Sequence, residues 1–368
     1  MAGSGVPGRY MDSRFHGVDA WRAALLFGGP VVHSAAIASS MHGNVEWLQV
    51  IARASHDFRM EAFFILSGFL VAISQAKNDK GWLLRRMLQL GIPFFVTWMS
   101  VVPLYLYGEA LAEGRPFVWK LNNLVHLWFL MDLLLLTPLV WVGDRKGWIN
   151  ALQRSADGSP GVFWLAFVMT WLIIWVVVKA TAYVPLFSSG LPATLAGVPY
   201  YGMFYIAGMI ASRSSGVREH LASSRWWVAG PVMWVVALTF YALFYNQVIH
   251  PGNWGLHAIS MALELGAAGC MSYAVLATAL RMARPSRLAG ALIGSAYTVY
   301  LVHMAFVGVT AWLLARDGFA EGSLFVGTSA VSLIASVAFH ELVVKRSAIM
   351  MLLINGKIPF RAKPQPRC

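Results

Sequence analysis

Long apolar segments separated by short polar connections recur along the whole chain. A helix that crosses the hydrocarbon core of a bilayer needs about 20 predominantly apolar residues. The pattern therefore predicts an all-α integral membrane protein with about ten transmembrane helices. The ten segments that qualify are 19–40, 57–76, 87–110, 123–142, 161–183, 196–212, 226–248, 254–280, 288–315 and 323–352. The segment at 196–212 is short and rich in Gly and Tyr, and it fits the pattern least well.

The connections between these segments are too short to hold a soluble domain. The first segment is broken by Gly28, Gly29 and Pro30, which favours a retained helix over a cleaved signal peptide. The last residues are basic, and we expect them to lie against lipid headgroups. The expected organisation is a cytoplasmic leader over 1–18, a ten-helix membrane domain over 19–355 and a basic cytoplasmic tail over 356–368.

The basic residues alternate between connections in a way that gives an orientation. If the N-terminus is cytoplasmic, 22 of the 28 Lys and Arg residues fall at cytoplasmic ends or connections. Cytoplasmic loops of membrane proteins carry an excess of Lys and Arg. We therefore expect both termini to be cytoplasmic.

The composition is typical of a membrane protein and argues against a soluble or nucleic-acid-binding protein. Charged residues make up 12% of the 368 residues, against about 25% in soluble domains. The net charge of +12 would favour nucleic-acid binding in a soluble protein, but here the charges lie between apolar segments. We expect the lipid bilayer as a partner and no nucleic acid.

The cysteines indicate neither a disulfide nor a metal site. The chain has two, Cys270 inside an apolar segment and Cys368 at the end. No spacing typical of a cysteine metal site occurs, and we expect no bound metal.

Ionisable side chains inside apolar segments cost several kcal/mol unless they are paired or hydrated, so they often mark functional interiors. Arg22 and His33 lie eleven residues apart in the first segment. Eleven helical residues are about three turns and rise about 16 Å, so both side chains face nearly the same way. They are expected to line one wall of a channel, although a lone membrane histidine also occurs in hydrogen-bonded packing.

A second cluster precedes and opens the second segment. Arg59 and Glu61 lie at its predicted outer end, and Ser67 and Gly68 follow about two turns later. The charged residues are candidates for contact with a ligand. The Ser-Gly pair permits the close approach either of a ligand or of another helix.

Further candidates come from four other segments. The adjacent Arg85 and Arg86 suit phosphate groups, or they set the topology. Tyr300 and His303 share a helix face that could position a hydroxyl substrate or satisfy itself in the core. The remaining candidates are His126 and Trp128, which also fit an interfacial anchor, and Glu264 inside the eighth segment.

Together these fragments resemble the acyltransferase 3 family of membrane O-acyltransferases, and within it the glucan succinyltransferase type. The stretches that carry the resemblance are VDAWRAALLFGGPVVHS (18–34), HDFRMEAFFILSGF (56–69), RRMLQLGIPFF (85–95), HLWFL (126–130) and SAYTVYLVH (295–303). The resemblance implies a ten-helix enzyme of the bacterial inner membrane. Such an enzyme moves a succinyl or acetyl group from cytoplasmic acyl-coenzyme A to a hydroxyl of a periplasmic glucan or another extracytoplasmic glycan.

The resemblance also implies roles for individual residues. Arg22 and His33 correspond to the family's essential pair, and Arg85 and Arg86 fall where coenzyme A phosphates would bind. The chemistry is consistent, because a sugar hydroxyl needs a base of near-neutral pKa, and histidine supplies one. We therefore expect His33 as general base and Arg22 as the residue that orients the donor. The expected substrate-binding residues are Arg59, Glu61, Ser67, His126, Trp128, Glu264, Tyr300 and His303.

Two other functions fit the residues less completely. A proton-coupled transporter would also have midplane ionisable groups and broken helices, but the chain shows no two-fold repeat. A non-catalytic partner of a polysaccharide assembly system would need no acyl-coenzyme A. The sequence leaves open whether the chain forms a homo-oligomer.

Overall fold

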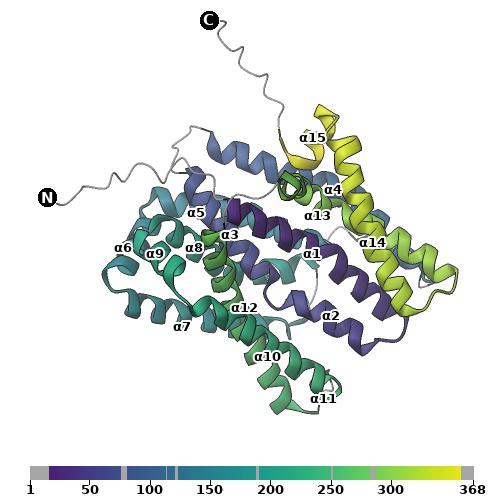
Figure 1. The fold of residues 1–368 in the computed structure, drawn as a ribbon, viewed down its shortest axis with the longest axis horizontal. Helices are drawn as coiled ribbons and strands as arrows, with labels where there is room; N and C mark the ends of the chain where they lie inside the picture. The colour runs from purple at the N-terminus through teal and green to yellow at the C-terminus, as the bar shows by residue number, and fades with distance from the viewer. Residues whose placement is uncertain are drawn as a thin grey trace, which may run out of the picture.

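The protein is a bundle of helices that includes the predicted membrane spans (Figure 1). The computed structural model describes residues 16–75, 81–112, 114–120, 123–187, 190–249, 252–282 and 287–357. In this part of the chain, nine helices are long and apolar enough to cross a membrane. They are α1 (His16–Met41), α4 (Trp82–Ala112), α5 (Trp128–Arg145), α7 (Pro160–Thr181), α8 (Gly190–Arg213), α10 (Ala229–Leu243), α12 (Trp254–Arg281), α13 (Arg287–Arg316) and α14 (Glu321–Phe339). Three of these spans include an adjoining helical turn and run over Val125–Arg145, Trp226–Leu243 and Glu321–Val344. The predicted all-α membrane architecture is confirmed.

The remaining predicted span is α3 (Arg59–Gln75), which has 17 residues. That length is at the lower limit of about 17–25 residues for a transmembrane helix. Every residue from Glu61 to Phe69 is buried. Such a helix, apolar and buried on all sides, belongs in the middle of a bundle, and Figure 1 shows α3 there.

One predicted span is wrong in its extent. The segment 323–352 was expected to be a single helix, but α14 ends at Phe339 and a π-helical turn follows over His340–Val344. The separate helix α15 (Ala348–Asn355) comes next. The break is stabilised by α13, where the Thr298 hydroxyl lies 2.7 Å from His340 Nδ1 and donates to Asn355 Oδ1 at 3.0 Å.

Short helices fill connections for which the sequence predicted no structure. They are α2 (Glu46–His56), α6 (Trp148–Gly158) and α9 (Ser215–Ser223). A fourth short helix, α11 (Tyr245–Ile249), begins inside the predicted span 226–248, in which α10 ends at Leu243. These helices are too short to span a bilayer, so they contain no run of about 20 apolar residues by which they could be predicted. In α2 the apolar Leu48 is fully buried while Glu46 faces outward, so one side of the helix packs on the bundle. The weakly predicted span at 196–212 is in fact the 24-residue helix α8.

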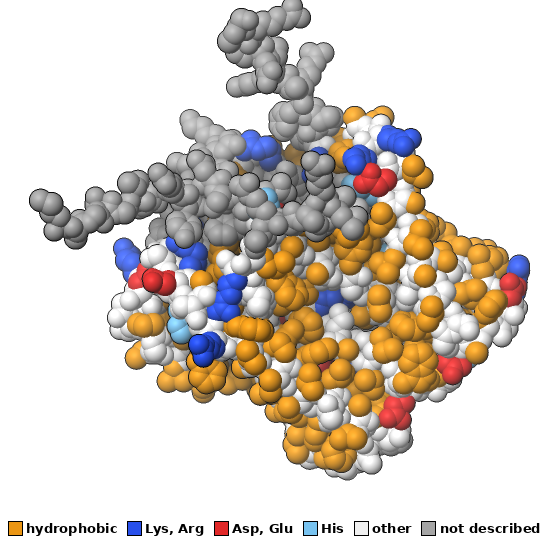
Figure 2. Space-filling view, in the orientation of Figure 1, with side chains coloured by type: hydrophobic (Ala, Val, Ile, Leu, Met, Phe, Trp, Pro, Cys, Tyr) orange, Lys and Arg blue, Asp and Glu red, His pale blue; other side chains and the backbone are white. Residues whose placement is uncertain are grey.

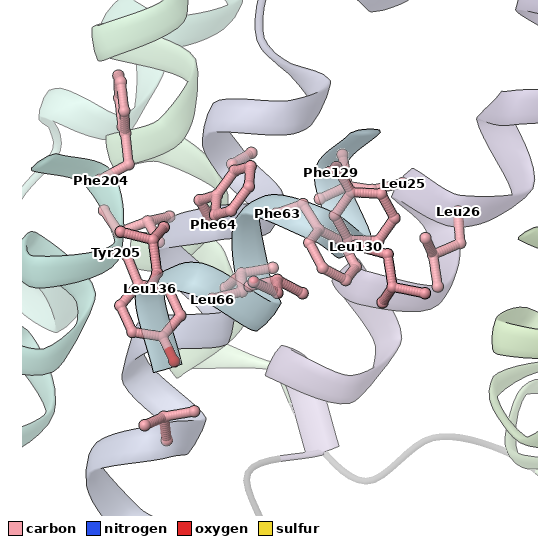
Figure 3. Close-up of a cluster of buried hydrophobic side chains, with 14 of the residues drawn as sticks. Leu25, Leu26, Phe63, Phe64, Leu66, Phe129, Leu130, Leu136, Phe204 and Tyr205 are labelled. Atoms are coloured by element: carbon pink, nitrogen blue, oxygen red, sulfur yellow. The ribbon is translucent and has the colours of Figure 1, made fainter. Parts of the chain in front are cut away.

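The core of the bundle is built where α3 crosses α8. A methyl group placed on Gly68 would lie 2.7 Å from the Tyr205 carbonyl carbon, and one on Gly208 would lie 2.8 Å from the carbonyl carbon of Ile65. The two backbones therefore touch, as small residues allow in membrane bundles. Figure 3 shows the aromatic and aliphatic side chains beside this crossing, among them Phe63 and Phe129, whose ring centres are 4.9 Å apart.

The outer surface of the bundle suits lipid. No residue of α7 is buried, although α7 is the most apolar of the nine spans. Figure 2 shows hydrophobic side chains over much of one face, while basic side chains gather at its margin over α6 and α9. A helix that is apolar all round and exposed in the isolated chain is a lipid-facing span.

The two predicted terminal segments lie mostly outside the described residues. Residues 16–18 of the expected leader belong to α1, and Gly356 and Lys357 of the expected tail follow α15. Residues 1–15 and 358–368 are outside the described part of the chain.

Candidate functional site

The predicted site begins on α1, which holds Arg22 and His33 on one continuous helix. Pro30 lies inside this helix and is buried together with Gly29. The helix continues through Pro30 because a proline removes only one backbone hydrogen bond. The small residues next to it allow neighbouring helices to pack closely. The two side chains point into the bundle, where they meet different partners.

Arg22 contacts residues from four other helices. Its guanidinium carbon lies 5.2 Å from the centre of the Phe63 ring. Arg86 of α4, Asp19 of α1, Tyr205 of α8 and Tyr297 of α13 are all within electrostatic range of it. We call Arg22, Arg86, Tyr205 and Tyr297 the arginine cluster.

The arginine cluster is suited to an anion. The Nε atoms of Arg22 and Arg86 are buried and have no hydrogen-bond partner. Two cations that share a buried space repel one another and are costly to desolvate unless anions pair with them, and Asp19 can balance only one of the two charges. Guanidinium groups bind phosphate through several planar donors. Arg85, on the adjacent position of α4, is half-buried.

His33 lies in a group of aromatic residues that we call the histidine cluster: His33, His126, Tyr300 and His303. The ring centre of His303 is 5.3 Å from that of His33 and 5.1 Å from that of His126. The Tyr300 hydroxyl donates a hydrogen bond to the His126 backbone carbonyl. His126 and His303 are buried, whereas His33 keeps partial exposure. His33 is therefore the most accessible of the three imidazoles.

Backbone contacts fix the tautomer of His303. Its Nδ1 lies 2.6 Å from the Tyr300 carbonyl oxygen and 3.0 Å from that of Val299. Because a carbonyl oxygen only accepts, Nδ1 carries the proton and Nε2 presents a lone pair. This Nε2 is buried and has no partner. It is a hydrogen-bond acceptor that lacks a donor.

A cavity of about 350 Å³ lies beside the start of α3. This volume is within the range of small-molecule sites. We call it the aromatic cavity, and its lining does not include His33. The lining residues are His56, Glu61, Trp128, Trp175, Val178, Lys179, Ala182, Ala193, Thr194, Gly197, Tyr200, Tyr201 and Glu264.

Glu61 supplies a polar group to the aromatic cavity. Its side chain is 7% exposed, and its Oε1 accepts a hydrogen bond of 3.1 Å from the Tyr200 hydroxyl. Its Oε2 is buried without a partner. Trp128 forms part of the wall with its ring centre 5.0 Å from that of Tyr201. Aromatic walls with one unpaired carboxyl oxygen suit a ligand that is apolar on its faces and carries hydroxyl groups.

Comparisons with known proteins identify the family of the chain. The acyltransferase 3 family model, described as an acyltransferase domain, matches residues 15–341. The chain belongs to the acyltransferase 3 family. The match includes every residue of the arginine cluster, the histidine cluster and the aromatic cavity. With its nine candidate spans, the protein is a multi-pass membrane acyltransferase.

The acyltransferase is also similar to curated proteins of bacterial origin. Relatives named Glucans biosynthesis protein C, from Escherichia coli O157:H7, O1:K1 / APEC and O6:K15:H31 (strain 536 / UPEC), are each 25% identical to it. Each alignment covers 64% of this chain and 67% of the relative. No solved structure matches the acyltransferase significantly.

The structure of the acyltransferase brings most of the predicted residues into three neighbouring groups. Arg22 and Arg86 lie in the arginine cluster, and Glu61, Trp128 and Glu264 line the aromatic cavity. The predicted residues His33, His126, Tyr300 and His303 form the histidine cluster. Among the described residues, no group of three or more His, Cys, Asp or Glu is placed to hold a metal ion.

Ser67 lies apart from these groups. It is buried beside Gly68 at the contact between α3 and α8, and its hydroxyl has no partner. Gly68 there lets the helix backbones touch, which was the alternative interpretation of the Ser-Gly pair. The binding role expected for Ser67 stays a prediction.

Several polar residues of the site did not appear among the predicted ones. Arg53 of α2 donates to Glu264 Oε2 at 2.7 Å, and it lies 2.5 Å from Asp57. Its spacing of four residues from Asp57 was the only local signal of an ion pair. Asp132 of α5 is fully buried, and neither of its carboxyl oxygens has a partner.

Proposed function

We propose that this acyltransferase moves a succinyl or acetyl group from cytoplasmic acyl-coenzyme A to a hydroxyl of a periplasmic glucan or another extracytoplasmic glycan. The family supplies the reaction class, and the names of the relatives support a glucan as the acceptor. The relatives also support the bacterial inner membrane as the location.

One observation carries the proposal: α1 presents Arg22 and His33 to two different clusters inside the bundle. The residues are separated by about 16 Å along the helix axis. One helix therefore links a site suited to phosphate with an accessible imidazole. A donor that carries its phosphates at one end and its reactive thioester at the other fits this spacing.

With the proposed orientation, each cluster lies on the side of the membrane from which its proposed substrate would bind. With both termini cytoplasmic, Arg22 and Arg86 lie in the cytoplasmic halves of α1 and α4. The aromatic cavity is lined by the beginnings of α3, α5 and α8 and by the end of α7, which are then the external ends. Coenzyme A would enter from inside, and the glycan would bind from outside.

In the proposed reaction His33 acts as the general base. It accepts the proton of the sugar hydroxyl while the hydroxyl oxygen forms a bond to the thioester carbonyl carbon. The carbon–sulfur bond then breaks, and His33 returns the proton to the sulfur of the leaving coenzyme A. Arg22, Arg85 and Arg86 hold the donor by its phosphates. Direct transfer is favoured because no cysteine lies in these clusters.

The test uses the full chain reconstituted in nanodiscs with acyl-coenzyme A and a glucan. Mass spectrometry of the glucan and release of free thiol measure transfer. Replacing the base in His33→Ala should lower kcat by about 10²–10⁴-fold. His220→Ala in the exposed helix α9 is the matched control and should retain full activity.

The possible outcomes test the proposed function and the role of His33 separately. If the wild-type protein acylates no glycan, the proposed function is wrong. If His33→Ala acylates as fast as the control variant, the function stands and the role of His33 is wrong.

A further inference from the structure

Gly29, one helical turn before His33, is buried, and polar groups border the space that a side chain would occupy there. A methyl group on Gly29 would lie 3.3 Å from His303 Nε2 and 3.4 Å from Arg59 Nη1. Both polar atoms therefore converge on the position where any other residue would have a side chain. The neighbouring Gly28 differs, because its methyl group would make ordinary contacts at 3.5 Å and 3.7 Å with Ser55 and the Arg59 side chain.

The two groups at this space have complementary hydrogen-bonding roles. His303 Nε2 is an acceptor, because Nδ1 holds the ring proton against the backbone carbonyls. Arg59 is a donor only, since guanidinium has no acceptor atom. His303 Nε2, which faces Gly29, is buried without a partner; on Arg59 the buried atom without a partner is Nε, while Nη1 is the atom that faces Gly29. Unpaired buried groups of this kind cost free energy, which a ligand can recover.

One donor and one acceptor together match a hydroxyl group. A hydroxyl accepts with its oxygen and donates with its hydrogen, so it can satisfy Arg59 and His303 at once. A carbonyl or carboxylate oxygen would leave the lone pair of His303 unpaired. The space is therefore better suited to an alcohol than to an acid.

This hydroxyl is not the one that reacts. The reacting hydroxyl gives its proton to His33, whose ring centre is 5.3 Å from that of His303. Two hydroxyls on adjacent carbons of a sugar ring can meet two neighbouring imidazoles at once. An isolated hydroxyl can meet only one of them.

We propose that Arg59, His303 and the gap at Gly29 form a subsite for a second hydroxyl of the acceptor, adjacent to the hydroxyl that is acylated. The inference rests on the proposed function and specifies its acceptor: a sugar with hydroxyls on neighbouring carbons. Arg59 donates to the oxygen of the second hydroxyl, and His303 accepts its hydrogen. The sugar is thereby fixed with the reacting hydroxyl toward His33.

The position of Arg59 supports this role. Arg59 is the first residue of α3 and lies two positions before Glu61, which lines the aromatic cavity. One helix end therefore contributes to both places.

The first experiment compares acceptors with the wild-type protein in nanodiscs. Mass spectrometry identifies the acylated position on a methyl glucoside or a short glucan. Deoxy analogues that lack either the adjacent hydroxyl or a remote one are then tested. A site built to hydrogen-bond a hydroxyl rejects an analogue that lacks it by up to about 10⁴–10⁵-fold. We expect kcat/KM to fall at least 100-fold for the adjacent deoxy sugar and less than about fivefold for the remote one.

The second experiment compares two neighbouring glycines. Gly29→Ala places a methyl group in the subsite, so it should lower kcat/KM for the intact acceptor and remove the preference over the adjacent deoxy sugar. Gly28→Ala is the matched control and should keep both the rate and the preference. Binding of acyl-coenzyme A, measured by calorimetry, should be the same in both variants.

These measurements separate the subsite from the function. Equal kcat/KM for the intact and adjacent deoxy acceptors in the wild-type protein overturns the subsite while the acyl transfer itself remains. Wild-type protein that transfers to no acceptor overturns the proposed function instead. The wild-type comparison does not depend on whether Gly29→Ala folds.

Discussion

The contact between α3 and α8 leads to a prediction about stability. Replacing Gly68 by Ala would put a methyl group 2.7 Å from the Tyr205 carbonyl carbon and into overlap with the carbonyl oxygen. These are backbone atoms, so no side-chain rotation relieves the overlap. An ordinary contact at 3.4 Å to the carbonyl carbon alone requires the two helices to separate by about 0.7 Å, and the nearer carbonyl oxygen requires a larger separation. Gly208 is in the same position toward Ile65, so the helices touch on both sides.

The size of the effect follows from two opposing terms. Overpacking of a well-packed interior costs about 1–3 kcal/mol, and a rigid backbone neighbour puts this contact at the upper end. Replacing a helical glycine by alanine recovers about 0.5–1 kcal/mol of backbone entropy. We expect a net loss of about 2 kcal/mol in the free energy of unfolding of Gly68→Ala.

A matched variant isolates the contact. A methyl group on Gly91 of α4 would lie 3.8 Å from Leu134, an ordinary distance, so Gly91→Ala should be neutral or slightly stabilising. Thermal unfolding in detergent can be followed by intrinsic fluorescence, since the chain has 16 tryptophans. Gly68→Ala should unfold several degrees below Gly91→Ala, and it should also lose acyl transfer because α3 carries Arg59 and Glu61. Equal unfolding temperatures for the two variants would refute the direct backbone contact.

Two further predictions concern the arginine cluster and the aromatic cavity. Arg22→Gln should weaken acyl-coenzyme A binding about 10–100-fold by calorimetry, because a phosphate partner is lost. The same change should leave the unfolding temperature unchanged or higher, because repulsion from Arg86 is removed; a lower temperature with unchanged binding would contradict both roles. Tyr200→Phe leaves Glu61 Oε1 without its donor. It should raise the KM for the glycan about tenfold and leave the KM for acyl-coenzyme A unchanged, and the reverse pattern would place the donor in the cavity.

The spans of the bundle could be predicted because every helix that crosses the lipid must itself be apolar, which is a property of a short stretch of sequence. Each crossing needs its own run of apolar residues, so the sequence alone locates α1 or α7. The break at His340 could not be predicted in this way. It depends on Thr298, 42 positions earlier, whose hydroxyl is 2.7 Å from His340 Nδ1. The helix α2 also escaped prediction, since it covers the bundle without crossing it.

The same distinction applies to the site: some of its contacts could be predicted from the sequence and others could not. Arg22 and His33 could be paired from the sequence because both lie on one helix, and helical geometry fixes their relative direction. The approach of His126 to His303 joins α13 to the start of α5, and no periodicity connects them. Arg53 and Glu264 are 211 positions apart and meet only through packing. Contacts within a helix follow from spacing, whereas contacts between helices require the fold.

The order of the three groups along the bundle bears on how transfer across a membrane is achieved. On the proposed orientation, the arginine cluster is toward the cytoplasm, and the histidine cluster and the aromatic cavity are both farther toward the outside. The rise of about 16 Å from Arg22 to His33 is roughly half of a 30 Å hydrocarbon core. A donor held by its phosphates at Arg22 therefore needs to extend only its thioester arm to His33. In the proposed reaction, the charged part of coenzyme A would stay at the cytoplasmic side, and the glycan would stay at the external side. Only the acyl group would then cross, and the cost of moving either polar molecule through lipid would be avoided.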